Sequence, residues 1–264
     1  MEFFDTHAHL NFKDYSKDRE NVIKGSLKES VFMVNVGTNL KESERVVRIA
    51  KKYKDGVYAS VGLHPLYTES EDFLPKNYER LAKNEKTVAV GETGLDYKYT
   101  FQNTGEKTEE ERKRRQQKVF KQHINLARDL NLPLIIHCRK AHQDTIATLK
   151  SVAGSDPATL SGVVHCFSGG KKEADEYLNL GFYLGINGII FKMNLEKTIR
   201  EIPLERILIE TDCPFLTPPP EKGRNQPLFV KHIAKEVARI KGISIKDVAE
   251  ATTKSAKELF NIDL

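Results

Sequence analysis

Short apolar runs rich in β-branched residues alternate along the chain with longer, more polar segments. There are eight of these runs, and most are almost continuously apolar, as expected for strands of a sheet that is buried on both faces. They span residues 2–7, 31–36, 57–63, 87–92, 134–137, 162–166, 182–186 and 206–210. Such strands, separated by helical segments, predict repeated βα units around a parallel sheet.

The segments between the runs carry signals for the start of helices. Asn39 is a candidate N-cap with Glu42 three residues later, and Thr108 with Glu111 repeats this capping-box pattern. Eight strands with eight helical segments predict a (β/α)₈ TIM barrel, a fold of about 250 residues, with a doubly wound open sheet as the alternative. Since no linker or low-complexity tract interrupts the pattern, we predict a single domain over residues 1–264.

Composition narrows the class of protein further. The chain is 39% hydrophobic and 30% charged, which is typical of a globular protein rather than a disordered or fibrous one. Its net charge of +5 favours a polyanionic partner only slightly. We expect a cytoplasmic protein, because the chain has neither an apolar run of membrane-spanning length nor a signal-peptide pattern. Three cysteines without a CxxC motif argue against a disulfide framework and a thiolate zinc site.

Histidines and acidic residues fall at the predicted carboxyl ends of strands. His7 and His9 form an HxH motif, and the period of two along a strand places both on one side, together with Asp5. The other four such residues are Glu92, His137, His165 and Asp212. In a barrel these ends converge on the face where active sites are built, and a divalent cation would compensate buried imidazoles and carboxylates. Separate hydrogen-bonded residues that support loops are the alternative.

This ligand chemistry indicates two metal ions rather than one. Imidazole and carboxylate ligands without thiolate suit Zn²⁺, Mn²⁺, Fe²⁺ or Co²⁺, and six ligands exceed the four of a tetrahedral zinc ion. Two divalent cations sharing a carboxylate would use all six and could promote hydrolysis at phosphorus. The cysteines Cys138, Cys166 and Cys213 each follow a candidate ligand, so we expect them to point toward the helices as packing residues.

Several motifs of the chain resemble those of the TatD-like metal-dependent deoxyribonucleases, a family of the amidohydrolase-type barrel superfamily. The motifs are FxDTHxHL from Phe3, VGLHP from Val61, VGETGLDY from Val90, PLIIHCRKA from Pro133, HCFSG from His165, ETDCPFLTP from Glu210 and GRNQP from Gly223. The resemblance covers essentially the whole chain. One departure is Lys140, where relatives commonly carry an acidic residue.

The resemblance implies a phosphodiesterase that hydrolyses DNA from a 3′ end by attack of a metal-bound hydroxide on phosphorus. The implied ligands of one metal are His7, His9, Glu92 and Asp212, and those of the other are Glu92, His137 and His165. Asp212 would also orient or deprotonate the attacking water, so Asp212 and the bridging Glu92 are the expected catalytic residues. His64 and Arg224 are implied to lie near the scissile phosphate. The cations are Zn²⁺, Mg²⁺, Mn²⁺ or a similar ion.

Other interpretations stay open at this point. A metallohydrolase of the same barrel could act on an ester or amide, such as an aminoacylated tRNA, and a nucleic-acid-binding protein could keep a relict site. His64 could instead cap a turn before Pro65, and Arg224 could pair with a neighbouring acid. The expected partner is DNA, single-stranded or with 3′ ends, with no membrane and no obligate protein partner.

Overall fold

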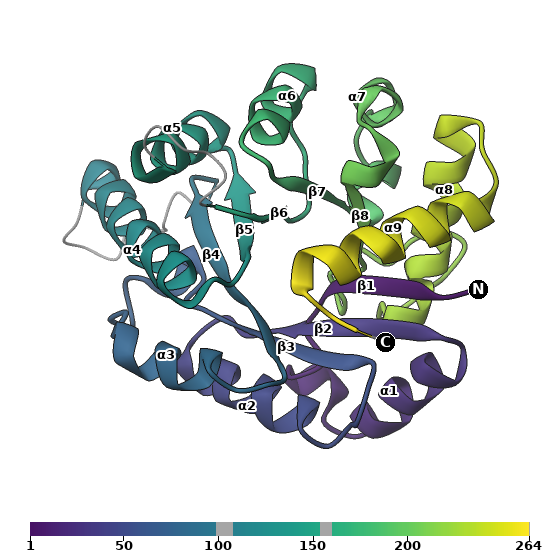
Figure 1. Ribbon diagram of the computed structural model, residues 1–264, viewed down its shortest axis with the longest axis horizontal. Coiled ribbons are helices and arrows are strands. Elements are labelled where there is room, and N and C mark those ends of the chain that lie inside the picture. Colours follow the sequence, from purple (N-terminus) through teal and green to yellow (C-terminus); the bar gives the residue numbers. More distant parts are fainter. Residues whose placement is uncertain (99–107, 154–159, 264) are drawn as a thin grey trace.

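The computed structural model describes residues 1–98, 108–153 and 160–263, and its strands form a parallel barrel surrounded by helices (Figure 1). The strands follow one another around a single sheet in sequence order. They are β1 (Phe3–Ala8), β2 (Val31–Val36), β3 (Val57–Val61), β4 (Thr87–Asp96), β5 (Leu134–Arg139), β6 (Gly162–Val164), β7 (Tyr183–Ile186) and β8 (Ile207–Ile209). The predicted (β/α)₈ barrel is confirmed.

The helices form a layer outside the strands. They are α1 (Arg19–Lys28), α2 (Leu40–Ala50), α3 (Pro75–Ala82), α4 (Glu109–Leu130), α5 (His142–Ala153), α6 (Lys171–Asn179), α7 (Glu196–Glu201), α8 (Val230–Lys241) and α9 (Ile245–Phe260). Both predicted N-caps are confirmed. The Asn39 side chain accepts a hydrogen bond from the Glu42 N–H, and Thr108 and Glu111 form a reciprocal capping box.

Hydrogen bonds between the carboxyl-terminal part of β1 and the end of β8 with the segment after it close the barrel. The Asp212 N–H donates to His7 O, and the His9 N–H donates to Cys213 O, each over 2.9 Å. The Thr6 hydroxyl also donates to Ile209 O. This closure brings three of the predicted metal ligands together from opposite ends of the sequence.

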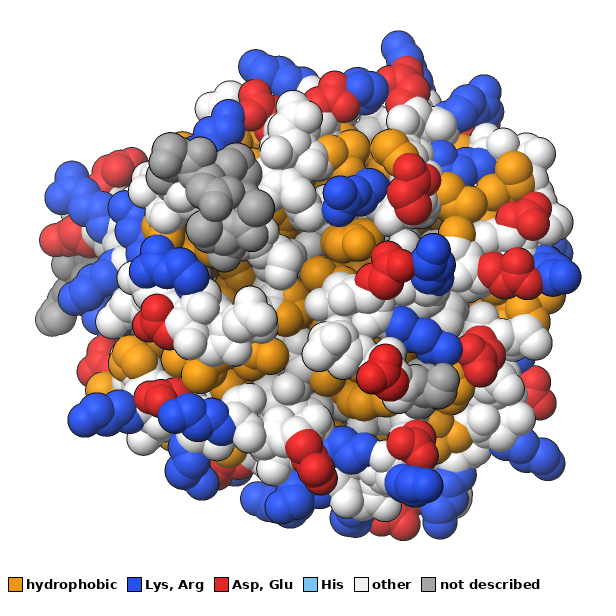
Figure 2. Space-filling view, in the orientation of Figure 1, with side chains coloured by type: hydrophobic (Ala, Val, Ile, Leu, Met, Phe, Trp, Pro, Cys, Tyr) orange, Lys and Arg blue, Asp and Glu red, His pale blue; other side chains and the backbone are white. Residues whose placement is uncertain are grey.

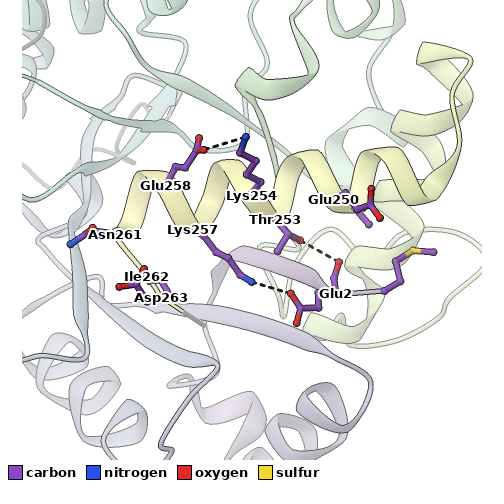
Figure 3. Close-up of a pocket in the computed structure, with 11 residues that line it drawn as sticks. Glu2, Glu250, Thr253, Lys254, Lys257, Glu258, Asn261, Ile262 and Asp263 are labelled. Atoms are coloured by element: carbon purple, nitrogen blue, oxygen red, sulfur yellow. Dashed lines mark hydrogen bonds and ion pairs between the residues drawn. The ribbon is translucent and has the colours of Figure 1, made fainter.

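One end of the barrel is closed by apolar side chains. Phe4, near the start of β1, packs against the Tyr58 ring at 6.1 Å and the Phe260 ring at 6.2 Å, so the end of α9 covers the amino-terminal mouth. A depression beside α9 is lined by charged side chains that pair with one another, including Lys257 with Glu2 (Figure 3). The opposite mouth, at the carboxyl ends of the strands, contains the histidines and carboxylates predicted as metal ligands.

The charged surface shows no segregation on the face in Figure 2, where basic and acidic side chains are interspersed. In the described part of the chain, no helix combines the length and apolar character needed to cross a membrane. The cytoplasmic location stays a prediction.

Candidate metal centre

The six residues predicted as metal ligands lie together at the carboxyl-terminal mouth of the barrel. His7 and His137 lie within β1 and β5, whereas His9, His165 and Asp212 directly follow or lie just beyond strands. The sixth residue is Glu92, and its predicted position at the end of a strand is wrong. Strand β4 continues to Asp96, because its pairing with β5 shifts register between Val90 and Thr93 and then resumes.

Gly91 makes this irregularity possible. Its φ is 155°, and a Cβ added there would lie 2.5 Å from the carbonyl oxygen of Ile135 on β5. A larger residue would therefore push the two strands apart. The irregular segment directs the Glu92 carboxylate into the centre, where only 3% of the residue is exposed.

His7, His9, Asp212 and one oxygen of Glu92 form a first group of donor atoms. His7 Nε2 lies 3.1 Å from His9 Nε2, 3.4 Å from Glu92 Oε2 and 4.0 Å from Asp212 Oδ1. His9 Nε2 lies 3.7 Å from Glu92 Oε2 and 3.5 Å from Asp212 Oδ1. Ligands around a tetrahedral cation with bonds of 2.0 to 2.2 Å are separated by about 3.3 to 3.6 Å. These five separations bracket that value, so the group fits one cation.

The tautomer of His9 also fits a role as a metal ligand. Its Nδ1 lies 3.0 Å from the carbonyl oxygen of Val36, which can only accept a hydrogen bond. Nδ1 therefore carries the proton, and the Nε2 of the neutral ring presents a lone pair to the other donors. Metal-ligating histidines are commonly fixed in this way, by a carbonyl at the second nitrogen.

The other oxygen of Glu92 faces a second group of imidazoles. Glu92 Oε1 lies 2.9 Å from His137 Nδ1, 3.8 Å from His165 Nε2 and 3.5 Å from His64 Nε2. Burial alone would raise the pKa of Glu92, but the imidazoles of His64, His7 and His137 together outweigh it and hold that pKa well below its usual range. A carboxylate with its two oxygens turned toward separate groups has the shape of a ligand shared by two cations.

His64 lies at the centre, but its ring presents a proton rather than a lone pair. Its Nδ1 accepts the N–H of Leu66 over 3.1 Å, which caps the short turn that begins at Pro65. In the neutral ring the proton is therefore on Nε2, facing Glu92. Burial lowers the pKa of His64 to about 3, which favours the neutral ring. The structure therefore shows the turn-capping interpretation of His64, and the ring also faces the centre. Its position near a scissile phosphate stays a prediction.

The structure does not bring Arg224 to the six residues. Its guanidinium forms hydrogen bonds of 2.6 and 3.0 Å with the Asp18 carboxylate and lies 4.2 Å from the centre of the Tyr15 ring. The structure therefore shows the alternative interpretation, a pair with a neighbouring acid. Contact with a phosphate stays a prediction. Lys140 is exposed and has a φ of 57°, and no role follows from its position.

Two buried carboxylates contact candidate ligand histidines, and the sequence pattern indicated no role for them. Glu210 Oε1 lies 2.7 Å from His165 Nδ1, and Asp96 Oδ2 lies 3.1 Å from His137 Nε2. Both acids stand inside the quoted motifs, Asp96 at the end of β4 and Glu210 directly after the apolar strand β8, and this position was the available signal. A carboxylate on the far nitrogen of a metal-bound imidazole fixes its orientation and raises its basicity.

Asp5 and Cys138 have structural roles. The Asp5 carboxylate accepts the N–H and the hydroxyl of Thr211 over 2.8 and 2.6 Å, so it fastens β1 to the segment after β8. The Sγ of Cys138 contacts His142 and Thr145 at 3.3 Å, which confirms that this cysteine points toward the helix layer.

Comparison with known proteins adds sequence and fold similarity along the whole chain. Residues 4–261 match the model of a family described as TatD related DNase. The uncharacterized metal-dependent hydrolase YabD of Bacillus subtilis is 38% identical, over 98% of this chain and 99% of its own. A protein of Erwinia tasmaniensis named 3′-5′ ssDNA/RNA exonuclease TatD is 33% identical, over 98% of this chain and 100% of its own. The crystal structure of YJJV, a TatD homologue of Escherichia coli, has a TM-score of 0.85 at 27% identity, over 99% of this chain and 98% of that one.

Proposed function

Because this chain belongs to the TatD family of metal-dependent hydrolases, we propose that it removes nucleotides from the 3′ end of single-stranded DNA with the help of two divalent cations. The observation that carries the proposal is the geometry of Glu92, whose two oxygens face two separate groups of imidazoles. The exonuclease name of the Erwinia tasmaniensis relative supports the choice of substrate.

The residues that would hold the cations follow from the two groups. His7, His9, Asp212 and Glu92 Oε2 would hold one cation. His137 and His165, which both face Glu92 Oε1, would hold the other together with that oxygen. Divalent cations at such a site lower the pKa of water and neutralise charge on the phosphoryl oxygens. Imidazole with carboxylate suits Zn²⁺ and Mn²⁺, and Mg²⁺ is the further candidate.

The protein's own groups would then act on the phosphodiester. The water oxygen forms a bond to phosphorus while the P–O3′ bond to the preceding nucleotide breaks, and the leaving O3′ gains a proton from solvent. Asp212 accepts the proton of the attacking water on its carboxylate, which is 15% exposed and therefore open to the mouth. His64 donates its Nε2–H to a phosphoryl oxygen, a role for which its fixed tautomer is suited.

The test is digestion of a single-stranded oligonucleotide with a label at one end. With Mn²⁺ or Mg²⁺ present, we expect a 3′ label to be released at once as a mononucleotide and a 5′ label to give a ladder of shortening products. Chelator should stop both reactions. The variant Asp212→Asn should lower turnover by about 10²- to 10⁴-fold, the contribution of a positioned general base.

The matched control is His232→Ala, which removes a half-buried histidine paired with Glu221 away from the centre. It should leave the rate of digestion unchanged. Internal cutting of a circular single strand would contradict the exonuclease mode. Inert DNA together with hydrolysis of an aminoacyl ester would contradict the phosphodiesterase itself.

A further inference from the structure

Large apolar side chains are exposed around the mouth that holds the candidate centre. Among the described residues, the exposed large apolar side chains are Met1, Tyr67, Leu74, Met193, Phe215 and Ile243. Four of these, Tyr67, Leu74, Met193 and Phe215, lie in connecting segments that follow the carboxyl ends of strands. Phe215 is 53% exposed and stands three residues after Asp212. Exposing half of a phenylalanine beside an active-site acid forgoes the burial that would stabilise the fold, which suggests a ligand.

An aromatic path connects Phe215 with the candidate centre. The Phe12 ring is stacked on the His9 ring, with centroids 4.6 Å apart and planes inclined by 5°. The Phe215 ring meets Phe12 at 6.2 Å in an edge-to-face arrangement. An aromatic surface therefore runs from a proposed metal ligand to solvent.

The backbone of Phe215 is held by buried groups. Its N–H donates to Asp212 O over 3.0 Å. The side-chain amide of Asn225, which is fully buried, donates to the carbonyl oxygens of Phe215 and Thr211 over 2.6 and 2.9 Å. The exposed ring is thus mounted on a fixed loop, so little conformational entropy is lost when a ligand covers it.

The cations in the loops that carry Phe12 and Phe215 stand beside acids. Lys13 and Lys17 are each followed by an aspartate, Lys222 follows Glu221, and Arg224 is paired with Asp18. Gripping the phosphate backbone with cations would require an excess of positive charge in this region. Stacking on an aromatic ring is the other general source of affinity for single strands, and it depends little on sequence.

We propose that Phe215 is a stacking platform for an unpaired base of a nucleotide that adjoins the scissile phosphate. This inference rests on the proposed function and adds a substrate preference to it. A base can lie flat on the ring only when it has left its duplex partner, so the platform selects unpaired over paired ends. Its affinity comes from the face of the base, so all four bases are accepted.

The experiment is a double-substitution cycle between Phe215→Ala and removal of a base. Four single-stranded substrates are compared: the intact oligonucleotide and versions with a tetrahydrofuran abasic residue at the last, second-last or third-last position. With intact DNA, Phe215→Ala should lower kcat/KM by about 5- to 150-fold, the range of base–aromatic stacking. With the abasic residue at the stacked position, the same substitution should change kcat/KM less than twofold. Phe215→Tyr, which keeps the ring, should keep the wild-type difference in kcat/KM between the intact and the abasic substrate.

Binding provides a readout that is independent of turnover. Fluorescence anisotropy of the same labelled oligonucleotides in excess chelator should show the same dependence on ring and base. The control Ile243→Ala removes an exposed apolar side chain from the turn between α8 and α9, and it should affect neither measurement.

The outcomes distinguish failure of the stacking platform from failure of the proposed nuclease activity. An equal effect of Phe215→Ala on intact and all abasic substrates, or no effect on any of them, overturns the platform while the nuclease stands. A wild-type protein that cleaves neither DNA nor RNA with any of the candidate metals overturns the proposed function and the platform with it.

Discussion

Replacing Glu210 by Gln tests whether the carboxylate behind His165 contributes to metal binding. Glu210 is fully buried, and its Oε1 lies 2.7 Å from His165 Nδ1. Glutamine preserves the size of the side chain but removes the negative charge. The His165 imidazole would then donate to a neutral oxygen, and the Nε2 of His165 would become a weaker metal ligand.

The surroundings of Glu210 determine the size of the effect. Oε1 also accepts the N–H of Cys166 over 2.8 Å and the amide of Asn187 over 3.0 Å, so the oxygen of the new glutamine should stay on this side. Its NH₂ group then replaces Oε2, which has no hydrogen-bond partner among the described residues and packs closely against Gly185. A buried NH₂ without an acceptor costs about 1 to 3 kcal/mol of unfolding free energy. The loss of the outer carboxylate should weaken one metal by about 10- to 100-fold.

Calorimetric titration of the metal-free protein with Zn²⁺ or Mn²⁺ measures both metals. We expect two equivalents in the wild type, and one unchanged and one weakened equivalent in Glu210→Gln. The matched control is Glu221→Gln, which alters a similar carboxylate–imidazole pair, 2.9 Å to His232, near the surface. Equal affinities for both equivalents in wild type and Glu210→Gln would refute the role assigned to this carboxylate.

Two further predictions concern Glu92 and His123. Glu92→Gln should weaken both metals together, because its two oxygens face the two groups, and elemental analysis that finds one metal fully retained would contradict the bridge. His123 is buried, its Nδ1 donates to Val119 O and its Nε2 accepts the N–H of Leu63. Burial lowers its pKa to about 3, so the unfolded chain binds a proton that the folded one excludes, and stability should fall as pH drops from about 6.5 toward 3. The glutamine in His123→Gln can make both hydrogen bonds without titrating. Chemical unfolding of the metal-free variant between pH 4 and 6 should therefore show an unfolding free energy that changes less steeply with pH, by up to about 1.4 kcal/mol per pH unit. An unchanged slope would exclude His123 as the source of the pH dependence.

The sequence predicted the fold and the meeting of six side chains for one physical reason. In a parallel barrel every strand ends at the same mouth, so residues at strand ends converge even when they are more than two hundred positions apart. The apolar runs located seven of the eight strand ends to within two residues. They placed the end of β4 four residues too early, because the irregularity at Gly91 interrupts the apolar pattern while the pairing with β5 resumes.

Contacts that depend on side-chain direction could not be predicted in this way. The alternation of a strand placed Asp5 beside His7 and His9, but its carboxylate binds Thr211, because hydrogen bonds of the barrel closure lie within its reach. Arg224 meets Asp18 across 206 positions, and neither residue belongs to a periodic pattern that would indicate the pair. Asp96, the last residue of β4, and Glu210, directly after β8, were visible as acids beside apolar runs. Their partners lie elsewhere in the barrel, His137 on β5 and His165 after β6, and no pattern along the chain indicates either pair.

The tautomers of His9 and His64 are the feature of the site that the sequence indicates least. Both are strand-end histidines with Nε2 directed at Glu92, at 3.7 and 3.5 Å. A backbone carbonyl at the Nδ1 of His9 leaves a lone pair on its Nε2, whereas a backbone N–H at the Nδ1 of His64 leaves a proton there. One ring can therefore bind a cation and the other can donate to an anion. Two residues of the same type acquire opposite chemistry because a single main-chain atom differs behind each ring.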